Sequence, residues 1–419
     1  MSPPTVLLIG TLDTKGDEYA FLRDRLRDAG VDVLVADVGS LDAPGFEADI
    51  PREEVASCTG ADLSALAQAR DRGAAVTAMT EAATVLTKRL YDEGKIDGVL
   101  AAGGSGGTAI ASRAMQALPV GVPKLIVSTM AAGDTRDYMG ARDVTMMAAV
   151  ADVAGLNAVS ARVLANGAAA MAGMVSAPAV EVDEDRPLVG ASMFGVTTPC
   201  VTVAREELEK LGYEAVVFHA TGAGGQAMEG LMESGFLKGV LDATTTELCD
   251  DLVGGILTAG PDRLEMAGRL GIPQVVSVGA LDMVNFGARD SVPAQFEERN
   301  LYVHNPVVTL MRTTKEENVE LGRRIARKLS AAKGPTALFL PLGGVSMIDA
   351  EGQPFHDPEA DAALFEELRK VGEGVELVEL DVNINDHEFA HAMVAKLDEY
   401  MQSSPKQPAR PAAKGTESV

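Results

Sequence analysis

The N-terminal part of the chain contains the pattern that most restricts its fold. Val6–Ile9 is a short continuous apolar run, as expected for a strand that is buried on both faces. After a loop at residues 10–16, apolar residues recur at helical spacing, and Gly30 stands where such a helix would end. Val31–Asp37 is a second apolar run. A strand–helix–strand unit of this kind pairs its strands in parallel, so the sequence predicts an α/β fold.

The same strand–loop–helix pattern recurs in the second half of the chain. The segments GVLAAGGSGGT and GVPKLIVSTMAAGD are echoed, in the same order, by GVLDATTTEL and GIPQVVSVGALD. We interpret the echo as a divergent internal duplication that gives two Rossmann-like lobes with mainly parallel sheets. Chance similarity is the alternative, because α/β proteins reuse this pattern. The second copy has Thr244–Glu247 in place of the glycines, so the two lobes are not expected to share one chemistry.

A polar segment with a proline, Glu181–Pro187, separates the two halves of this 419-residue chain. We predict an N-terminal lobe over residues 1–180, a C-terminal α/β lobe over 181–402, and a disordered tail over 403–419 that is rich in Pro, Ser, Lys and Ala. The Ala-rich stretch Met146–Met174 predicts a long helical region that is interrupted by Gly155 and Gly167. Its small residues would let two helices approach closely, so we expect a homodimer interface there.

The composition restricts the classes of partner. A net charge of −25 argues against non-specific binding to nucleic acid or to an anionic membrane surface. A local group of backbone N–H donors can still hold phosphate in an acidic protein, and the acidity also serves solubility. The three cysteines form no CxxC motif, so neither a disulfide framework nor a zinc site is expected. We find no signal peptide or membrane span and expect a cytoplasmic protein.

The strongest local signal is the segment GGSGGT at Gly103–Thr108, which follows an apolar strand and opens a helix. A turn without Cβ atoms lets backbone N–H groups approach a phosphate, and the positive end of the helix dipole favours the anion. Ser105 and Thr108 would add hydroxyl donors. The segment is not a Walker A loop, because no Gly-Lys-Ser/Thr follows. The alternative is a tight turn required by close helix–sheet packing.

Two further loops are predicted at the same carboxyl edge of the sheet, where ligands bind in open α/β folds. In the first, Lys15 would meet phosphate charge, and Asp13 would hold Mg²⁺ or accept from a ribose hydroxyl. A turn with a helix cap and a solvated lysine is the alternative. In the second, Asp134 is the other candidate for Mg²⁺. The predicted cofactor-binding residues are Asp13, Thr14, Lys15, Gly103, Gly104, Ser105, Gly106, Gly107, Thr108, Met130, Ala131, Gly133 and Asp134.

The second lobe offers weaker candidates. The segment HATGAGGQ, which begins at His219, is a second glycine-rich anion-binding candidate. His219, Asp242 and His304 are candidates for acid–base chemistry, although a strand-end histidine with a satisfied hydrogen bond is the simpler reading of His219. His387 and His391 have the spacing of a metal pair on a helix, but no third ligand stands out, so solvated histidines are favoured.

Several motifs together resemble the tomato mosaic virus resistance-protein family. They include GTLDTKGDEYAFLRD, AAGGSGGTAIA, VSTMAAGDT, VFHATGAGGQAME, VGALDMVNFG and VHNPVVTLMRTT, and the resemblance runs from about Thr5 to Tyr400. It implies two Rossmann-like lobes, ATP with Mg²⁺ in the N-terminal lobe, and dimerisation. Bacterial members are mostly uncharacterised ATP-binding proteins. Plant relatives carry an extra C-terminal TIM-barrel-like domain, so a separately encoded barrel protein is a candidate partner.

Three functions are open at this point. In the first, ATP is a ligand or regulator, and the second lobe binds a partner or a small molecule. In the second, the chain is an enzyme that acts on a small anionic metabolite between the lobes, by phosphoryl transfer or sugar-acid chemistry. In the third, the chain is a partner-binding module with an idle pocket. The sequence does not decide whether the protein is an enzyme.

Overall fold

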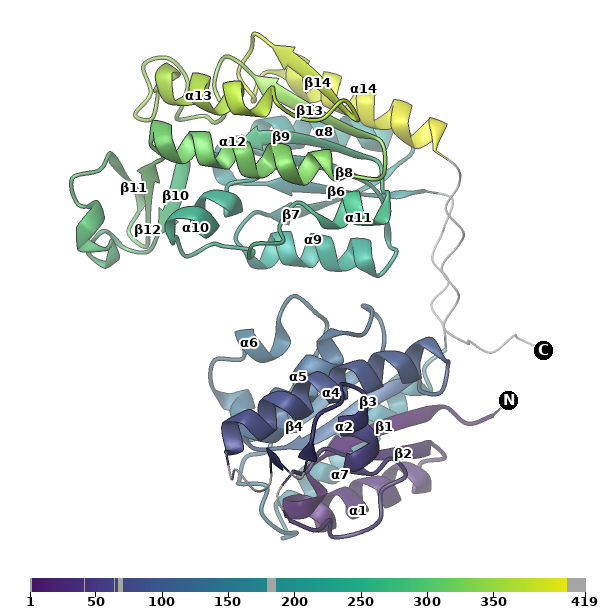
Figure 1. Ribbon diagram of the computed structural model, residues 1–419. Helices are drawn as coiled ribbons and strands as arrows, with labels where there is room; N and C mark the ends of the chain where they lie inside the picture. Colours follow the sequence, from purple (N-terminus) through teal and green to yellow (C-terminus); the bar gives the residue numbers. More distant parts are fainter. Residues whose placement is uncertain (1, 41, 64, 67–70, 179–185, 405–419) are drawn as a thin grey trace. The chain divides into compact units, whose positions relative to one another are not determined.

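The computed structural model describes the chain except for residues 1, 41, 64, 67–70, 179–185 and 405–419 (Figure 1). The chain divides into two compact units, which meet in the sequence between Glu181 and Val182. Most of the predicted boundary segment, at residues 181–185, and nearly all of the predicted tail lie outside the described residues. No helix of the described chain is long and apolar enough to cross a membrane.

Unit 1 is built on a five-stranded parallel sheet with the strand order β2-β1-β3-β4-β5. Its strands are β1 (Thr5–Gly10), β2 (Asp32–Asp37), β3 (Gly98–Gly103), β4 (Lys124–Ser128) and β5 (Thr145–Ala148). Its helices are α1 (Leu12–Asp28), α2 (Arg52–Ser57), α4 (Arg72–Asp92), α5 (Ser105–Gln116), η1 (Thr129–Ala132), α6 (Arg136–Met139) and α7 (Ser160–Val175). Because the strands are parallel, the loops after β1, β3 and β4 all leave from one edge of the sheet.

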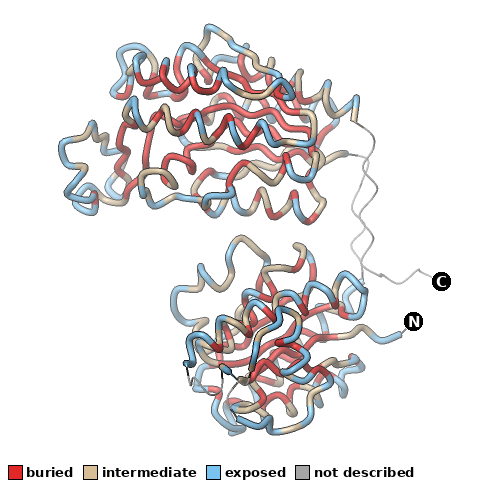
Figure 2. Tube along the Cα trace, viewed as in Figure 1, coloured by how far each residue is buried: buried red, intermediate tan, exposed pale blue. Residues whose placement is uncertain are grey.

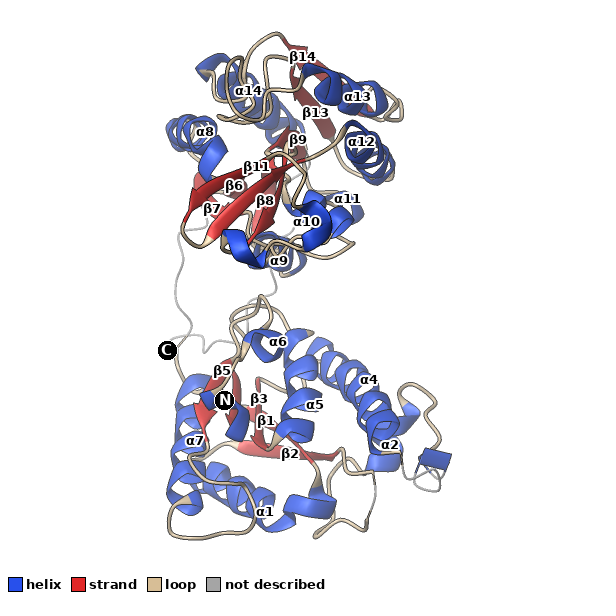
Figure 3. Ribbon diagram, turned by 90° about the vertical axis from the view of Figure 1, so that its left-hand side faces the viewer, coloured by secondary structure: helices blue, strands red, loops and turns tan. Residues whose placement is uncertain are grey.

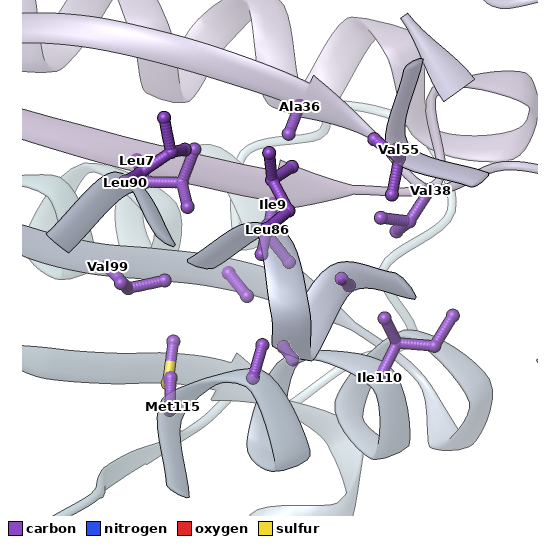
Figure 4. Close-up of a cluster of buried hydrophobic side chains, with 14 of the residues drawn as sticks. Leu7, Ile9, Ala36, Val38, Val55, Leu86, Leu90, Val99, Ile110 and Met115 are labelled. Carbon is purple, nitrogen blue, oxygen red and sulfur yellow. The ribbon is translucent and has the colours of Figure 1, made fainter. Parts of the chain in front are cut away.

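Helices cover both faces of this sheet (Figure 3). One face packs against α4 and α5 through a cluster that includes Leu7, Ile9, Leu86 and Ile110 (Figure 4). The other face packs against α1 and α7. The strands are therefore buried on both sides, as their continuous apolar runs predict (Figure 2).

Unit 2 has a six-stranded parallel sheet with the order β14-β13-β9-β8-β6-β7 and a separate three-stranded antiparallel sheet with the order β10-β12-β11. The strands are β6 (Leu188–Met193), β7 (Glu214–His219), β8 (Leu237–Thr244), β9 (Gln274–Gly279), β10 (Met283–Phe286), β11 (Leu301–Asn305), β12 (Val308–Arg312), β13 (Thr336–Pro341) and β14 (Val375–Leu380). The helices are η2 (Gly195–Thr197), α8 (Thr198–Lys210), α9 (Ala223–Glu233), α10 (Glu247–Val253), α11 (Met266–Leu270), η3 (Arg289–Ser291), η4 (Ala294–Phe296), α12 (Lys315–Ser330), α13 (Pro358–Leu368) and α14 (His387–Ser403).

The two parallel sheets share their topology. If the strands are counted within each parallel sheet, both sheets begin with the order 2-1-3-4-5, and unit 2 adds β14 at its edge. The echoed sequence segments fall on equivalent strands, because GVLAAGG forms β3 where GVLDATT forms β8, and the second pair forms β4 and β9. The two Rossmann-like lobes of the prediction are thus observed, and their common strand order fits a duplication.

Three expectations about local structure were wrong. Met146–Met174 is not one helical region, because its first residues add strand β5 to the sheet and α7 begins only at Ser160. Between them the backbone takes positive φ at Val150 and Gly155, which a continuous helix does not allow. The helix expected from Asp17 begins earlier, at Leu12, with a break at Lys15. The last helix, α14, runs one residue into the predicted tail.

Candidate nucleotide-binding site

The N-terminus of α5 lies at the end of β3, beside the point where the strand order of unit 1 reverses between β1 and β3. In open parallel sheets this reversal is where ligands bind. Gly104 is the N-cap residue, and no side chain of the described chain caps this helix end. The first turn contains Ser105, Gly106 and Gly107 and no acidic residue. Its backbone N–H groups and the positive end of the helix dipole therefore favour an anion.

The four glycines of this turn are not required by packing within the fold. A Cβ atom added at Gly103, Gly104, Gly106 or Gly107 would lie no closer than 3.7 Å to another atom of the described chain, which is an ordinary contact. None of the four has a positive φ. By contrast, a Cβ atom at Gly10 would lie 2.0 Å from the Tyr19 ring. The alternative of a tight turn imposed by helix–sheet packing therefore loses its physical basis here.

Two buried hydroxyl groups, those of Thr108 and Ser128, hold the backbone of the glycine turn in place. Thr108 Oγ1 donates to the Gly104 carbonyl at 2.8 Å and lies 2.6 Å from Ser128 Oγ at the end of β4. Ser128 Oγ in turn accepts from the Met130 N–H at 2.9 Å. Both hydroxyl side chains are buried. Thr108 therefore positions the turn, and the expected role as a hydroxyl donor to phosphate does not fit its burial.

Lys15 lies beside the glycine turn, as the prediction of a common edge requires. It sits at the break in α1, with φ −137° and ψ 32°. Its Cε atom is 3.7 Å from the Cβ position of Gly103. Its Nζ donates to the Val153 carbonyl in the loop after β5. The ammonium group thus links the glycine turn with that loop.

Arg72 is a site residue that the sequence reasoning missed. It is the first residue of α4, and its Nη2 atom is 3.9 Å from the Cβ position of Gly106. A basic residue opposes the dipole at this end of a helix, where acidic residues are favoured. That mismatch, in the sequence Asp71-Arg72 before a long apolar-periodic segment, was the available signal.

A hollow of about 380 Å³ lies next to the turn, at the carboxyl ends of β4 and β5. Its lining residues are Ser128, Thr129, Ala132, Ala148, Ala149, Val150, Ala151 and Asp152. Thr129 Oγ1 is 3.8 Å from the Cβ position of Gly104, so the hollow and the turn are contiguous. The predicted residues Met130 and Ala131 lie on η1, whereas Gly133 ends it. Small-molecule pockets in proteins start at about this volume.

Val150 is the strained residue of this hollow. It has φ 66° and an exposed fraction of 81%. A β-branched side chain rarely adopts this left-handed conformation, and an apolar one is rarely left this exposed. Strain of this kind is often found at ligand-binding positions.

The two aspartates proposed for Mg²⁺ already have protein partners. Asp13 accepts from the Ser40 N–H at 3.2 Å. Asp134 is exposed and binds Arg136, whose guanidinium lowers the pKa of this carboxyl to about 2. No group of three His, Cys, Asp or Glu side chains able to hold a metal is found in the described part of the chain. Mg²⁺ beside nucleotides is usually bound through one or two carboxylates together with the phosphates. Asp13, which lies on the same segment as Lys15 and accepts a hydrogen bond from Ser40, would fit as such a ligand.

The second glycine-rich loop, before α9, is filled by the protein itself. Glu247 Oε1 accepts from the N–H groups of Gly222 at 2.7 Å and Gly225 at 3.0 Å. A Cβ atom at Gly225 would lie 2.2 Å from Glu247 Oε2. This loop needs its glycines for packing, and its donors are taken by a carboxylate. The expectation of a second anion site is therefore not supported by this geometry.

Asp242 belongs to the same buried ionic network. The guanidinium of Arg263, which is 1% exposed, contacts both oxygens of Asp242 at 2.6 and 2.7 Å and Glu247 Oε2 at 2.6 Å. Ser192 Oγ donates to Asp242 at 2.6 Å. These partners hold the carboxylate in the interior, on β8 at the position that corresponds to Ala101 of β3, two residues before the glycine turn of unit 1.

The histidine candidates lie in different sheets. His219 ends β7, and its ring contacts Phe194 edge-on at 5.9 Å. His304 lies on β11 of the antiparallel sheet, beside Tyr302. Among the described residues, the ring of His219 contacts Phe194 and the ring of His304 contacts Tyr302, whereas Asp242 binds Ser192 and Arg263. The three candidates therefore have no ring or side-chain hydrogen-bond partner in common within the described chain. His387 and His391 are neighbours on α14, and His391 Nδ1 lies 3.9 Å from Glu207 Oε1.

A second buried acidic network was not predicted. Arg312 Nη2 contacts Asp361 at 2.6 Å and Asp349 at 3.3 Å, while Asp282 accepts from Ser346 Oγ at 2.7 Å. Burial, together with the neighbouring carboxylates, raises the pKa of Asp349 to about 9. Burial raises the pKa of Asp361 as well, so this pair of carboxyl groups holds protons to higher pH than free aspartates do. Asp349 and Asp361 also line a hollow of about 320 Å³ after β13.

The fold and the site define a class: a two-unit protein with parallel α/β sheets and a glycine-rich, positively charged helix N-terminus at the ligand edge of unit 1. The chain belongs to the uncharacterised protein family UPF0261. Residues 4–180 match the N-terminal domain of that family and residues 186–401 match its C-terminal domain.

Relatives cover both units. A UPF0261 protein of Clostridium tetani is 52% identical over 95% of this chain and 99% of its own length. The tomato (Solanum lycopersicum) protein named ToMV resistance protein Tm-1(GCR237) is 42% identical over 96% of this chain, which spans 56% of the tomato protein. Among solved structures, a UDP-N-acetylglucosamine 2-epimerase from Rickettsia bellii overlaps 65% of this chain and 78% of its own, with 12% identity and a TM-score of 0.23. That overlap is too weak to carry an argument.

Proposed function

We propose that unit 1 binds a nucleoside polyphosphate, ATP with Mg²⁺, at the N-terminus of α5. The observation that carries the proposal is the run of glycines at 103, 104, 106 and 107, which neither packing nor positive φ requires. Glycine within a helix destabilises the fold relative to alanine, and Gly106 and Gly107 lie within α5. A bare backbone surface is useful where a phosphate must approach the N–H groups closely.

The local electrostatics support an anionic ligand. The protein carries a net charge of −25, yet Lys15 and Arg72 both reach this turn. The first turns of α4 and α5 contain no acidic residue. Positive charge concentrated in this way raises the local concentration of phosphate ligands.

Each part of the site has a role in this proposal. The N–H groups of Ser105, Gly106 and Gly107 bind phosphate oxygens, and Lys15 neutralises their charge. The nucleoside occupies the hollow beside Thr129 and Val150. When bound, Mg²⁺ would supply positive charge that neutralises part of the phosphate charge, and Asp13 is the residue of this chain that would hold it.

For the protein as a whole, we propose that ATP acts as a ligand or regulator of a cytoplasmic homodimer, while unit 2 meets a partner or small molecule. A separately encoded barrel protein is one such partner. Light scattering that gives the 43.6 kDa mass of one chain at micromolar concentration would remove the dimer. The enzymatic alternative has less support, because its candidates His219, Asp242 and His304 share no contact among the described residues.

Calorimetric titration of ATP with Mg²⁺ tests the proposal, with wild type, Gly106→Val and Gly173→Val compared. Gly173 lies on α7 and, like Gly106, has no close neighbour, so it is a matched control. We expect wild type and Gly173→Val to bind and Gly106→Val, still folded, to lose binding. Equal binding by all three would place the nucleotide elsewhere, and no binding by wild type would reject the proposed function.

A further inference from the structure

We propose that the hollow after β13 in unit 2 binds a small organic cation, an ammonium ion on an apolar carbon group, through the carboxyl groups of Asp349 and Asp361. The inference rests on the part of the proposed function that gives unit 2 a small-molecule role, and it adds a site and a chemical class. It does not depend on the nucleotide site, because every lining residue of this hollow belongs to unit 2.

The hollow lies at the edge of the sheet where α/β proteins bind ligands. It has a volume of about 320 Å³, and the loop that leaves the carboxyl end of β13 lines it with Leu342, Gly343 and Gly344. The other lining residues are Asp349, Glu351, His356, Pro358, Asp361, Ala362 and Phe365. Small-molecule pockets start at about this volume, so the ligand is expected to be small.

The buried charges beside the hollow are mainly negative. Asp282, Asp349 and Asp361 are all buried, and the guanidinium of Arg312 is the positive charge that they share. Burial raises the pKa of all three carboxyl groups. Asp349 and Asp361 also form a hydrogen bond with each other, which requires a proton on one of them. A cation that enters the hollow can replace this proton as the balancing positive charge.

The guanidinium of Arg312 is engaged by the protein on all three nitrogen atoms. Nε donates to the Phe355 carbonyl at 2.8 Å, Nη1 to Thr313 Oγ1 at 3.0 Å and Nη2 to Asp361 at 2.6 Å. An anionic ligand in the hollow would therefore meet carboxyl oxygens without a guanidinium fork to bind it. A charge buried without such a partner is costly, so the lining favours a cation over an anion.

Asp282 is an independent indication that this network lacks a hydrogen-bond donor. Its Oδ2 atom accepts from Ser346 Oγ at 2.7 Å, whereas its Oδ1 atom is buried and has no hydrogen-bond partner among the residues that the structure describes. Such buried side-chain oxygens normally have a partner. The charge of Asp282 acts on Asp349, since it contributes to the raised pKa of that carboxyl. An ammonium ion supplies both of the missing features, a positive charge and N–H donors.

The rest of the lining favours an organic cation over a metal ion. Leu342, Pro358 and Phe365 give the hollow an apolar wall that suits a carbon group. In the described parts of the chain, no three His, Cys, Asp or Glu side chains are placed to hold a metal. The exposed carboxylate of Glu351 and the net charge of −25 attract cations from solution.

The test is a calorimetric titration of benzylammonium chloride into the full chain at pH 7, with benzyl alcohol and benzoate as the neutral and anionic analogues. Wild type is compared with Asp361→Asn and with Glu359→Gln, a control on the same helix whose side chain is exposed and pairs with Lys315. Wild type should bind benzylammonium at least about 10-fold more tightly than either analogue. Asp361→Asn should weaken this binding by about 10- to 100-fold, and Glu359→Gln by less than about twofold.

A second measurement follows the proton and uses Asp349→Asn, which serves also if Asp361→Asn fails to fold. The charged and titratable groups around the pair are Asp282, Arg312, Glu351, His356 and Asp357. A bound cation lowers the pKa of the two carboxyl groups, so wild type should release protons on binding. Its binding enthalpy should then differ between two zwitterionic buffers of different ionisation enthalpy. This difference should shrink in Asp349→Asn, because the amide carries no titratable proton.

The outcomes are distinct from those of the ATP titration, which concerns unit 1. Absence of benzylammonium binding by wild type, or equal affinity for benzyl alcohol, would overturn the proposal of a cation site. Unchanged binding by a folded Asp361→Asn would place the cation elsewhere and overturn it as well. The same buffer dependence in Asp349→Asn as in wild type would show that this carboxyl pair does not bind the ligand. None of these results changes the expectation for ATP.

Discussion

The glycines of the two glycine-rich loops differ in what surrounds them. A Cβ atom at Gly225 would lie 2.2 Å from Glu247 Oε2, whereas at Gly106 the nearest atoms would be 3.9 Å away. The sequence alone presents both loops as equal candidates for an anion site. The structure distinguishes them by their surroundings. The carboxylate of Glu247 occupies the loop before α9, whereas the side chains nearest to Gly106 leave room for a Cβ atom.

This difference predicts opposite effects of the same substitution. Gly106→Ala should leave the unfolding free energy of the apo protein unchanged or raise it by up to about 1 kcal/mol, because alanine favours the helix and meets no close atom. Gly225→Ala should lower it by about 1–3 kcal/mol through overpacking against Glu247. Urea unfolding of both variants measures this. A marked destabilisation by Gly106→Ala would restore the packing explanation of the turn.

The protonated state of Asp349 gives a pH dependence with a definite sign. Its pKa is about 9 in the folded protein, above the ordinary value of 3.8, so between these values the folded state binds more protons than the unfolded state. The contribution of Asp349 to stability is therefore complete below pH 4 and is lost as the pH rises toward 9, by up to about 1.4 kcal/mol per pH unit.

Asp349→Asn resembles the protonated side chain and should flatten this dependence. The amide can still accept from the Val345 N–H, which bonds to Asp349 Oδ2 at 2.8 Å. Unfolding of the variant and wild type should differ little near pH 4, and the variant should become increasingly the more stable protein as the pH rises toward 9. Parallel stability curves for the two proteins across this range would contradict the assignment.

At the scale of elements, Tyr19 couples α1 to the two strands that flank the site. Its hydroxyl donates to the carbonyls of Ile9 at 2.6 Å or Ala102 at 2.9 Å and accepts from the Ala102 N–H at 2.9 Å. Gly10 leaves room for the ring. The carboxyl ends of β1 and β3, from which the Lys15 and glycine segments emerge, are thus held together by one buried side chain.

Tyr19→Phe should lower the unfolding free energy by about 1–3 kcal/mol, because it leaves buried backbone groups without a partner. It should also weaken ATP binding more than it alters the secondary structure, since the two loops lose their common anchor. Chemical denaturation and calorimetry measure the two effects. Wild-type stability in the variant would show that the strands need no such link.

The elements themselves were largely predictable from sequence. The apolar runs Val6–Ile9 and Val31–Asp37 predicted β1 and β2 to within one residue at each end, because strands buried on both faces read as continuous apolar segments. The antiparallel sheet β10-β12-β11 was missed, since its short strands lack such runs. Lys15 could be predicted as a site residue because its loop follows the apolar strand β1. Arg72 is brought to the site by the packing of α4 on α5, which local sequence does not encode.

At the scale of the whole molecule, each unit has its own sheet and its own core. The buried Arg263 network stabilises unit 2 only, and its removal leaves Asp242 and Glu247 buried without their cation. Arg263→Met should therefore destabilise unit 2 by about 3–5 kcal/mol. ATP binding in unit 1 should persist. Differential scanning calorimetry with and without ATP measures both, and loss of ATP binding in this variant would mean that the units are not independent in this respect.

The most direct test of the central claim is a crystal structure of the protein with a non-hydrolysable ATP analogue and Mg²⁺. We predict phosphate oxygens within hydrogen-bond distance of the N–H groups of Ser105, Gly106 and Gly107, with the nucleoside in the hollow beside Val150. A nucleotide bound in unit 2, or an α5 N-terminus without phosphate at saturating ligand, would contradict it.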